Sequence, residues 1–504
     1  MIAVVSTLWR ERPLALILIL GGFFRLLAVF LSNGYAMHDD HFHVVEVAQG
    51  WVDGRDLFDW LSQTYGGSTS FRSLVYPGLV FLLFEGLEAL GLDDPMEKMG
   101  VLRLLHALWS MLAIVFVYRI AEVMGHHRAA RQAALLTAVL WLMPYISVRT
   151  LSEVACIPLL LAGAWLVLKY RTMREAWLAL LLAGLCFGLA FSIRYQSILF
   201  GAGMGLGLLL DRQVRPALWL LLGTLLPIGL IHGLLEGWIT GDPFGKVIYY
   251  IQYNATHSDE YIVLPWYNYL LLLVGILGPI GPLYFFGIFW KFRPYLPLFL
   301  GFMLFLAFHS YIPNKQERFL FTVLPAYFLL GSLGWNQFVQ HARFWTNNPG
   351  IQRGLWIAFW AINGLALLAF STYFPKEALV RAMYSLGQGS DPVHSLLVDD
   401  VRRPDTLFVP RYYSGQWPVV YVHTQKYDLA YLQRCFEALP ADRQPEVVLF
   451  IGNEQLDERV EDVRQLFPGL QFARHFEANA LDRFLHWLNE YNRTEEVYKY
   501  RVPE

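Results

Sequence analysis

Long apolar runs, separated by short polar segments, divide the first three quarters of the chain. Each run is close to the roughly 20 residues that an α-helix needs to cross the hydrocarbon core of a bilayer. We therefore expect an all-α polytopic membrane protein with about eleven transmembrane helices, at 13–32, 101–124, 132–148, 152–169, 177–193, 195–210, 217–238, 266–290, 295–312, 318–338 and 352–373.

The segment 73–91 is also apolar, and counting it as a span would invert the orientation of everything after it. With eleven spans, every cytoplasmic segment is basic, as the positive-inside rule requires. The basic residues of those segments are Arg10, Arg12, Arg128, Arg131, Lys169, Arg171, Arg174, Arg212, Arg215, Lys291, Arg293, Arg343 and Arg353. We therefore predict that 73–91 is an amphipathic helix on the outer surface, within a first outer loop over 33–100.

The composition changes after about residue 374, where charged residues become frequent. Short β-like runs then alternate with helical patterns, which is typical of an α/β domain. The expected strands are 406–409, 419–422 and 446–451, and the expected helices are 431–438 and 456–466. We predict a transmembrane domain over 1–374 and a small soluble α/β domain over 375–504, which an odd number of spans places on the outer side.

The overall composition agrees with a protein whose main partner is the lipid bilayer in which it is embedded. Of the 504 residues, 56% are hydrophobic and only 16% are charged, which is too apolar for a typical soluble protein. A net charge of −2 gives no reason to expect nucleic acid as a partner. The three cysteines are too few and too scattered for a disulfide framework.

A cluster of ionisable residues follows the first span directly. It contains Asp39 and Asp40, flanked by His38, His41 and His43. Charges near a membrane boundary are costly, so they are rare unless they have a function. Helical spacing of the apolar residues that follow indicates that a helix begins here.

Three roles are open for these residues. An Asp at a helix N-terminus is a common cap for free backbone N–H groups. A carboxylate here is also suited to act as general base on a hydroxyl group. Asp40 together with His41 and His43 offers mixed oxygen and nitrogen ligands for a metal, although neither a Cys nor a strict spacing supports a metal site.

Cationic residues gather on the same expected face. Lys315 and Arg318 lie three positions apart, and Arg149 and Arg194 occupy a similar depth on other helices. Single basic residues at span ends are usually interface anchors. Several of them on the side of the carboxylates indicate a shared anionic ligand, since Arg offers a planar fork and Lys a point charge for phosphate.

Five short motifs in order resemble those of the GT-C superfamily of polyprenyl-phosphate-sugar-dependent glycosyltransferases. The resemblance is greatest to the family 22 α-mannosyltransferases, including the glycosylphosphatidylinositol and asparagine-linked-glycan types. It covers the chain from its N-terminus to about residue 338. The motifs are His38-Asp39-Asp40-His41, Arg72-Ser73 with Tyr76-Pro77, Arg149-Thr150-Leu151-Ser152, Pro265-Trp266 with Tyr269, and Asn314-Lys315-Gln316-Glu317-Arg318-Phe319.

The resemblance implies transfer of a hexose from a polyprenyl-phosphate sugar to a hydroxyl of a glycan or glycolipid, and mannose is the expected hexose. It also implies inversion at the anomeric carbon, with Asp40 as general base and Asp39 orienting the acceptor or sharing that role. Lys315, Arg318, Arg149 and Arg194 would bind the donor phosphate. The residues expected to support the site or the acceptor are His38, His41, Arg72 and Trp266.

No cofactor is expected, because a monophosphate leaving group needs less charge neutralisation than a nucleotide diphosphate, and cationic side chains can supply it. The expected location is the bacterial inner membrane or the endoplasmic reticulum membrane, with the site facing the periplasm or lumen. The alternative function is a transporter or flippase of lipid-linked sugars, which should place polar groups near the midplane of several spans. A purely structural membrane subunit would leave the carboxylates and cations without a common purpose.

The topology is directly testable by cysteine accessibility. If 73–91 lies on the outer surface, Pro95→Cys and Lys376→Cys should both react with an impermeant maleimide added from the outer side of sealed vesicles. Labelling of position 95 only from the cytoplasmic side would contradict the eleven-span topology.

Overall fold

The structure is a computed structural model that describes residues 2–56, 72–260, 262–389, 392–401, 408–440, 443–489 and 496–503. The chain forms two compact units. Unit 1 contains residues 1–30, 54–80 and 102–372. Unit 2 contains residues 31–53, 81–101 and 373–504, so it joins three segments that are far apart in the sequence. The change of unit after Thr372 lies close to the domain boundary drawn at residue 374, and the domain division itself stays a prediction.

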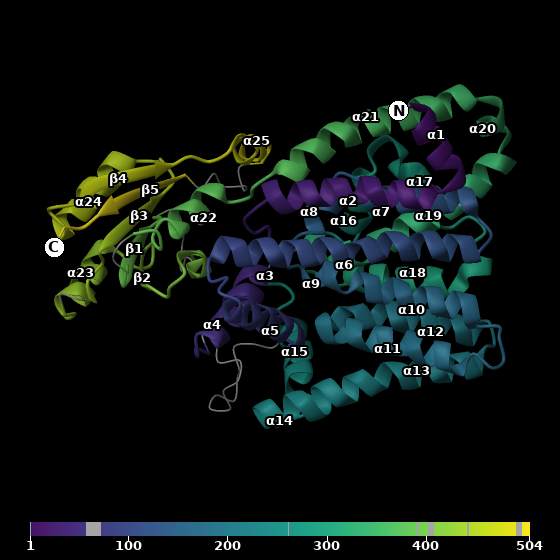
Figure 1. The fold of residues 1–504 in the computed structure, drawn as a ribbon, viewed down its shortest axis with the longest axis horizontal. Helices are drawn as coiled ribbons and strands as arrows, with labels where there is room; N and C mark the ends of the chain where they lie inside the picture. The colour runs from purple at the N-terminus through teal and green to yellow at the C-terminus, as the bar shows by residue number, and fades with distance from the viewer. Residues whose placement is uncertain are drawn as a thin grey trace. The chain divides into compact units, whose positions relative to one another are not determined.

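Unit 2 is built around a five-stranded sheet in the order β2-β1-β3-β5-β4 (Figure 1). Strand β1 pairs in parallel with β2 and β3, whereas β5 pairs antiparallel with both β3 and β4. The strands are β1 (Ser395–Asp399), β2 (Val419–His423), β3 (Val447–Ile451), β4 (Gln471–Phe476) and β5 (Val497–Arg501). The helices of the C-terminal segment are α22 (Glu377–Tyr384), α23 (Leu429–Glu437), α24 (Leu456–Leu466) and α25 (Ala480–Leu488).

The small α/β domain expected from the sequence is confirmed. Helices α23 and α24 supply Leu432, Phe436 and Val460 to one apolar core with Val448 and Phe450 of β3. The strands expected at 419–422 and 446–451 and both expected helices are present. The expected strand at 406–409 is not found in its described part, since Phe408 and Val409 belong to no strand, and residues 406 and 407 lie outside the described residues.

Unit 1 is helical. Figure 1 shows its long helices running side by side, with α10, α11, α12 and α13 as neighbours. The elements that lie wholly or mainly in this unit are α1 (Ile2–Glu11), α2 (Pro13–Leu31), α6 (Pro95–Val123), α7 (His127–Val139), α8 (Leu142–Ile146), α9 (Ser152–Ala155), α10 (Ile157–Tyr170), α11 (Trp177–Ile193), α12 (Ile198–Leu210), α13 (Val214–Ile228), α14 (Glu236–Thr240), α15 (Gly245–Thr256), α16 (Asn268–Ile276), α17 (Gly281–Gly287), α18 (Leu296–Tyr311), α19 (Leu324–His341), α20 (Arg343–Asn347) and α21 (Pro349–Thr372).

Helices occupy all the predicted spans, but fewer than eleven are long enough to count as spans by themselves. Within the described residues, seven helical runs are long and apolar enough to cross a membrane, and the bent pair α16 and α17 makes eight if it counts as one span. The pair bends by 117°. Leucines such as Leu218, Leu221 and Leu225 of α13 are exposed, as expected of a lipid-facing surface. The protein is therefore an integral membrane protein, and the number of eleven spans stays a prediction.

The apolar run 132–148 is a broken helix, because Leu140 has an extended backbone between α7 and α8. A break inside the membrane frees backbone groups that need new partners. Asn363 of α21 donates to the Val139 carbonyl at 2.9 Å and accepts from the Trp141 N–H at 2.8 Å. The guanidinium of Arg25 in α2 donates to the Ala138 carbonyl at 2.8 Å. Two buried polar side chains thus satisfy the end of α7.

Close contact between helices in unit 1 depends on glycine. A Cβ on Gly203 of α12 would lie 2.3 Å from the Leu300 carbonyl oxygen of α18, and one on Gly207 would lie 2.4 Å from Pro297 Cα. These residues are four apart and therefore share one face of the helix. This is the small-residue packing that lets membrane helices approach closely.

We expect Gly203→Val and Gly207→Val to lower the apparent Tm of the purified protein by several degrees, because overpacking a tight contact costs about 1–3 kcal/mol. Gly205→Val is the matched control in the same helix. A Cβ at position 205 meets only Leu220 Cδ2, at 3.9 Å. Equal Tm values for all three variants would contradict this account of α12 and α18.

Candidate active site

The acidic motif at 38–41 lies in unit 2 and is helical. Helix α3 (His38–Asp40) continues through the π-helical turn η1 (His41–Glu46) into α4 (Val47–Val52). The predicted helix start is therefore confirmed. π-helical turns inside α-helices occur frequently at functional sites, because the wider turn redirects the side chains around it.

Asp40 is buried, with 3% of its surface exposed. It stands at the N-terminal boundary of η1, yet its side chain makes no capping hydrogen bond. The residue before α3 is Met37, which has no capping side-chain bond either. The side chain of Asp40 therefore does not cap η1. The side chain of Asp39 is not among those that the structure describes.

His41 is a buried aromatic residue in a stack. Its ring lies between those of Tyr35, at 4.5 Å and 20°, and Tyr413, at 5.2 Å and 3°. Burial, together with the charges of His38 and Lys376, lowers the pKa of His41 to about 3, so the ring is neutral at physiological pH. His38 is exposed and packs on Phe42 at 4.3 Å. The support role predicted for His41 is thus compatible with packing.

Glu46 lies at the end of η1 and is fully buried. Its Oε1 accepts a hydrogen bond from the Tyr412 N–H at 3.1 Å and lies 3.8 Å from Nε2 of His41. Burial raises the pKa of Glu46 to about 7, against the opposing effects of Arg411 and the backbone N–H groups of Arg411 and Tyr412. A titratable carboxyl group therefore lies in the same helical turn as the acidic motif.

The metal alternative gains no support from the described side chains. No three His, Cys, Asp or Glu groups among them come close enough together to hold a metal ion.

Arg194 and Arg318, which were predicted to bind the donor phosphate, lie in unit 1 around the buried carboxylate of Glu153. Oε1 of Glu153 pairs with Nη1 of Arg194 at 2.9 Å and lies 3.6 Å from Nε of Arg318. Ser152 Oγ contacts both Glu153 Oε2, at 3.1 Å, and Arg194 Nη1, at 3.3 Å. The short helix α9 and the turn η6 (Glu317–Val323) therefore present Glu153 and Arg318 to each other.

Arg72 belongs to the same cluster. Its charge acts on the carboxylate of Glu153 and, together with Arg194, on the hydroxyl of Tyr250. Gln196, two residues after Arg194, donates a hydrogen bond to Tyr250 Oη. The structure thus brings together Arg72, Arg194 and Arg318, which the sequence places far apart.

The arrangement has an excess of positive charge. Arg194 and Arg318 pair with the single carboxylate of Glu153, and the charge of Arg72 also acts on it. Nε and Nη2 of Arg194 are buried without a hydrogen-bond partner among the described atoms. Buried donors on a charged group are costly when they are unpaired. Such a cluster is suited to an anion with several acceptor oxygens, such as phosphate.

Lys315 lies beside this cluster and is linked to it through its neighbour. It is buried, its Nζ donates to the Ile312 carbonyl, and it lies 5.5 Å from the centre of the Tyr269 ring. The Tyr269 hydroxyl bonds the backbone of Gln316, whose side chain accepts from Arg318 Nε at 2.7 Å. Burial lowers the pKa of Lys315.

The remaining two predicted residues have different surroundings. The guanidinium of Arg149 is buried and lies 4.6 Å from the centre of the Tyr145 ring. Trp266 is exposed and makes an edge contact with Tyr267 at 5.8 Å. Neither is among the groups that pair with Glu153.

A second buried network fixes the backbone next to two of the arginines. Glu236 accepts from the Leu74 N–H at 2.8 Å and from Ser73 Oγ at 3.2 Å, directly after Arg72. Its other oxygen bonds His232 Nδ1 at 2.7 Å, and His232 Nε2 bonds Ser192 at 3.0 Å, two residues before Arg194. The network therefore connects the segments that carry Arg72 and Arg194.

Three acidic residues of these networks were not among the predicted site residues: Glu46, Glu153 and Glu236. Glu153 and Glu236 lie within the predicted spans 152–169 and 217–238, and carboxylates inside a membrane are candidates for function by default. That signal was available in the sequence for these two, whereas Glu46 lies in the predicted outer loop.

The helical bundle, the acidic loop and the C-terminal sheet define a membrane protein with the GT-C fold. A solved structure of ArnT from Cupriavidus metallidurans bound to undecaprenyl phosphate is similar, with a TM-score of 0.63 and 13% identity over 98% of both chains. So is the archaeal oligosaccharyltransferase AglB from Archaeoglobus fulgidus in complex with an inhibitory peptide and a dolichol-phosphate, with a TM-score of 0.57 and 11% identity over 93% of this chain and 73% of that one.

Within that class, residues 16–389 match the Alg9-like mannosyltransferase family, and the chain belongs to that family. The curated Mannosyltransferase APTG1 of Arabidopsis thaliana is 23% identical over 316 residues, which are 60% of this chain. The chain spans 55% of the length of that relative. The family 22 resemblance inferred from the five motifs is therefore confirmed.

The buried Glu46 predicts a pH dependence of stability. Its pKa is raised from 4.5 to about 7 in the folded protein, so the folded state holds the proton more tightly than the unfolded state. The free energy of unfolding should therefore fall as pH rises from about 4.5 to about 7, by on the order of 3 kcal/mol. Glu46→Gln keeps an acceptor for Tyr412 and removes this loss.

The measurement is the apparent Tm of purified protein at pH 5 and pH 8. Glu46→Gln should raise the Tm over wild type at pH 8 and change it little at pH 5. The exposed Glu461→Gln is the control. A Tm difference that is the same at both pH values would show that Glu46 does not titrate in this range.

Proposed function

We propose that the chain is a membrane glycosyltransferase that transfers a hexose, mannose in the first place, from a polyprenyl-phosphate sugar to a hydroxyl group of a glycan or glycolipid. The reaction inverts the anomeric carbon and takes place on the periplasmic or luminal face. Membership of the Alg9-like mannosyltransferase family supports the reaction class. The structural relatives of the same fold have been solved with undecaprenyl phosphate or dolichol-phosphate, which supports a lipid-linked donor.

The observation that carries the proposal is the cluster around Glu153. Arg194 and Arg318 pair there with one carboxylate on which the charge of Arg72 also acts, and two buried donor atoms of Arg194 are unpaired among the described atoms. The phosphate of the donor supplies the acceptors that these groups lack. As the bond between the anomeric carbon and the phosphate oxygen breaks, negative charge grows on the phosphate, and preorganised cations stabilise that charge.

The proton of the acceptor goes to Asp40. The acceptor oxygen attacks the anomeric carbon, its proton passes to the Asp40 carboxylate, and the lipid phosphate leaves as an anion. The place of Asp40 in the His38-Asp39-Asp40-His41 motif and its burial at the start of the helical stretch support this role. Asp39 orients the acceptor, and Lys315 and Arg149 add to the positive potential on the donor side.

The roles of base and cap separate under Asp40→Asn. Asn caps a helix about as well as Asp, but it cannot accept a proton at neutral pH. We expect the transfer rate of folded Asp40→Asn to fall by roughly 100- to 10,000-fold. Asp39→Asn should lower the transfer rate less than Asp40→Asn does.

Arg318→Lys keeps the charge but loses the planar fork, so it should raise the donor KM more than the acceptor KM.

The assay measures transfer of radiolabelled sugar from a panel of polyprenyl-phosphate sugars. Arg119→Gln is the control, because the side chain of Arg119 is exposed and pairs with Glu122 of the same helix, away from the proposed site residues. Near-normal turnover by Asp40→Asn would remove it from the base role. Passage of lipid-linked sugar across a bilayer without transfer would favour the transporter instead.

A further inference from the structure

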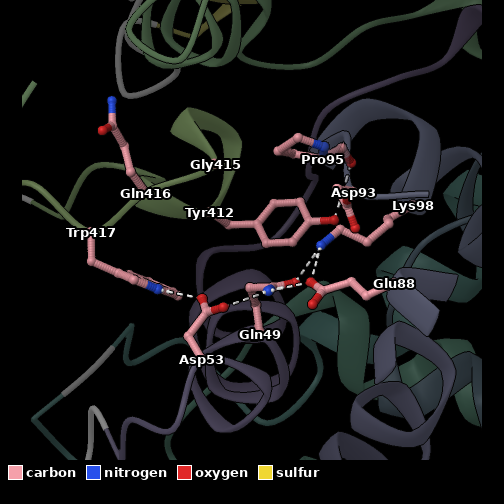
Figure 2. A pocket seen from close by; sticks show the side chains of 10 residues that line it. All are labelled: Gln49, Asp53, Glu88, Asp93, Pro95, Lys98, Tyr412, Gly415, Gln416 and Trp417. Atoms are coloured by element: carbon pink, nitrogen blue, oxygen red, sulfur yellow. Dashed lines mark hydrogen bonds and ion pairs between the residues drawn. The ribbon is translucent and has the colours of Figure 1, made fainter. Parts of the chain in front are cut away.

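A cavity lies within unit 2, and none of the residues that line it takes part in the proposed reaction. It has a volume of about 150 Å³ and is bounded by α4, by the end of α5 (Val75–Ala89) and the start of α6, and by residues 412–417. Figure 2 shows its side chains. The volume suits a single small ring and excludes a bulky ligand such as a lipid.

One wall of the cavity is a continuous chain of hydrogen bonds. Trp417 Nε1 donates to Asp53 at 2.6 Å, and Gln49 Nε2 donates to Asp53 at 3.2 Å and to Glu88 at 2.9 Å. Lys98 Nζ donates to Gln49 Oε1 and to Glu88 Oε1, both at 2.8 Å (Figure 2). Each bond fixes the rotamer of its neighbour, so the wall is preorganised.

Carboxylate oxygens of the cavity lining remain available to accept hydrogen bonds from a ligand. Oε1 of Glu88 accepts both bonds, which leaves Oε2 available. Asp93 lines the opposite part of the cavity and has no hydrogen-bond partner among the described residues. Burial raises the pKa of Glu88, but the bonds from Lys98 and Gln49 outweigh it and the net shift is downward, so Glu88 is a carboxylate at neutral pH. Carboxylates accept hydrogen bonds only, and they suit a ligand rich in hydroxyl donors.

Aromatic rings supply the apolar part of the lining. Tyr412 stacks on Phe84 at 5.6 Å and 21°, and its hydroxyl donates to the Pro95 carbonyl at 3.0 Å. Trp417 is partly exposed, with the guanidinium of Arg411 over its ring at 5.4 Å. Rings beside carboxylates and an amide match a hexose, which has apolar C–H faces and a rim of hydroxyl groups.

The charge of the lining selects among sugars. Asp53, Glu88 and Asp93 face one ammonium group, Lys98, and Arg411 only partly offsets the remaining negative charge. A phosphate or a uronic acid would be repelled at this site. A neutral hexose unit would not be.

The distance between the cavity and Asp40 indicates which sugar of an acceptor the cavity could hold. Gln49 and Asp53 follow Asp40 by nine and thirteen residues along the continuous helical stretch α3-η1-α4. At a rise of 1.5 Å per residue, this separation is roughly 13–20 Å along the helix axis. That is longer than one sugar ring, so a ring in the cavity is not the one that receives the new bond.

We propose that this cavity is a distal subsite for a neutral hexose unit of the acceptor. The acceptor is accordingly a chain of several sugars, and the cavity sets a preference for length. This inference rests on the proposed function for its link to transfer, but the binding of sugar at the cavity can be measured without any transfer.

The first arm of the experiment locates binding. A diazirine-bearing mannotriose is photocrosslinked to the full-length protein, and the modified peptides are mapped by mass spectrometry. We expect crosslinks within 85–98 and 411–419 that are suppressed by free mannotriose and not by glucuronic acid. Crosslinks confined to other segments would overturn the subsite.

The second arm measures transfer to a methyl mannoside and to a linear mannotetraoside. Trp417→Ala and Asp93→Asn should raise the KM of the longer acceptor about ten-fold and leave kcat and the KM of the monosaccharide unchanged. Trp417→Phe, which keeps a ring but loses the bond to Asp53, should have an intermediate effect. Trp487→Ala is the control, because Trp487 is an exposed Trp on α25.

The two proposals fail in different ways. If wild type crosslinks at the cavity but transfers no sugar from any donor, the proposed function is wrong and the subsite stands. If wild type transfers sugar and the Trp417 and Asp93 variants use both acceptors normally, the subsite is wrong. Asp93 is exposed, so Asp93→Asn gives a result even if Trp417→Ala does not fold.

Discussion

The ion pair between Glu153 and Arg194 is the interaction on which the polar site of unit 1 depends. A carboxylate with no solvent exposure in a helical membrane protein is stable only if its charge is compensated. Arg194 at 2.9 Å supplies that compensation, and Arg318 adds to it. In return, the carboxylate makes it possible to bury arginines among apolar helices. The price is a cluster whose formal charge stays positive, and that residual charge is what gives the site its affinity for an anion.

Polar groups elsewhere in the membrane unit follow the same constraint. Arg25 and Asn363 satisfy backbone groups at the broken end of α7. Oε1 of Glu236 accepts from the Leu74 N–H and from Ser73 Oγ, and its Oε2 bonds His232. In each case a costly side chain serves a particular group on another helix. Hydrogen bonds from these side chains therefore fix irregular segments of unit 1.

Much of this could be predicted from the sequence, because the bilayer imposes length and apolar character on every span. The helix at the acidic motif and two strands were predicted from local apolar patterns, and the convergence of Arg194 and Arg318 from their expected position on one face of the membrane. The break at Leu140 was not, since the apolar run continues through it. Strand β4 was missed because three of its six residues are polar, so no β-like apolar run marks it. The central role of Glu153 was missed because sequence spacing gives no distance between α9, α11 and η6.

The composition of unit 2 bears on how this protein can be recombined. Its sheet belongs to residues 373–504, yet the same unit includes 31–53, with the acidic motif, and 81–101. Tyr412 bonds both Glu46 and the Pro95 carbonyl, and Tyr384 bonds Asp94 at 2.7 Å. A chimaera that exchanges only the C-terminal segment with that of a relative would separate these partners. The three segments should therefore be exchanged together, and a substitution within 31–53 or 81–101 should be compensated within 373–504.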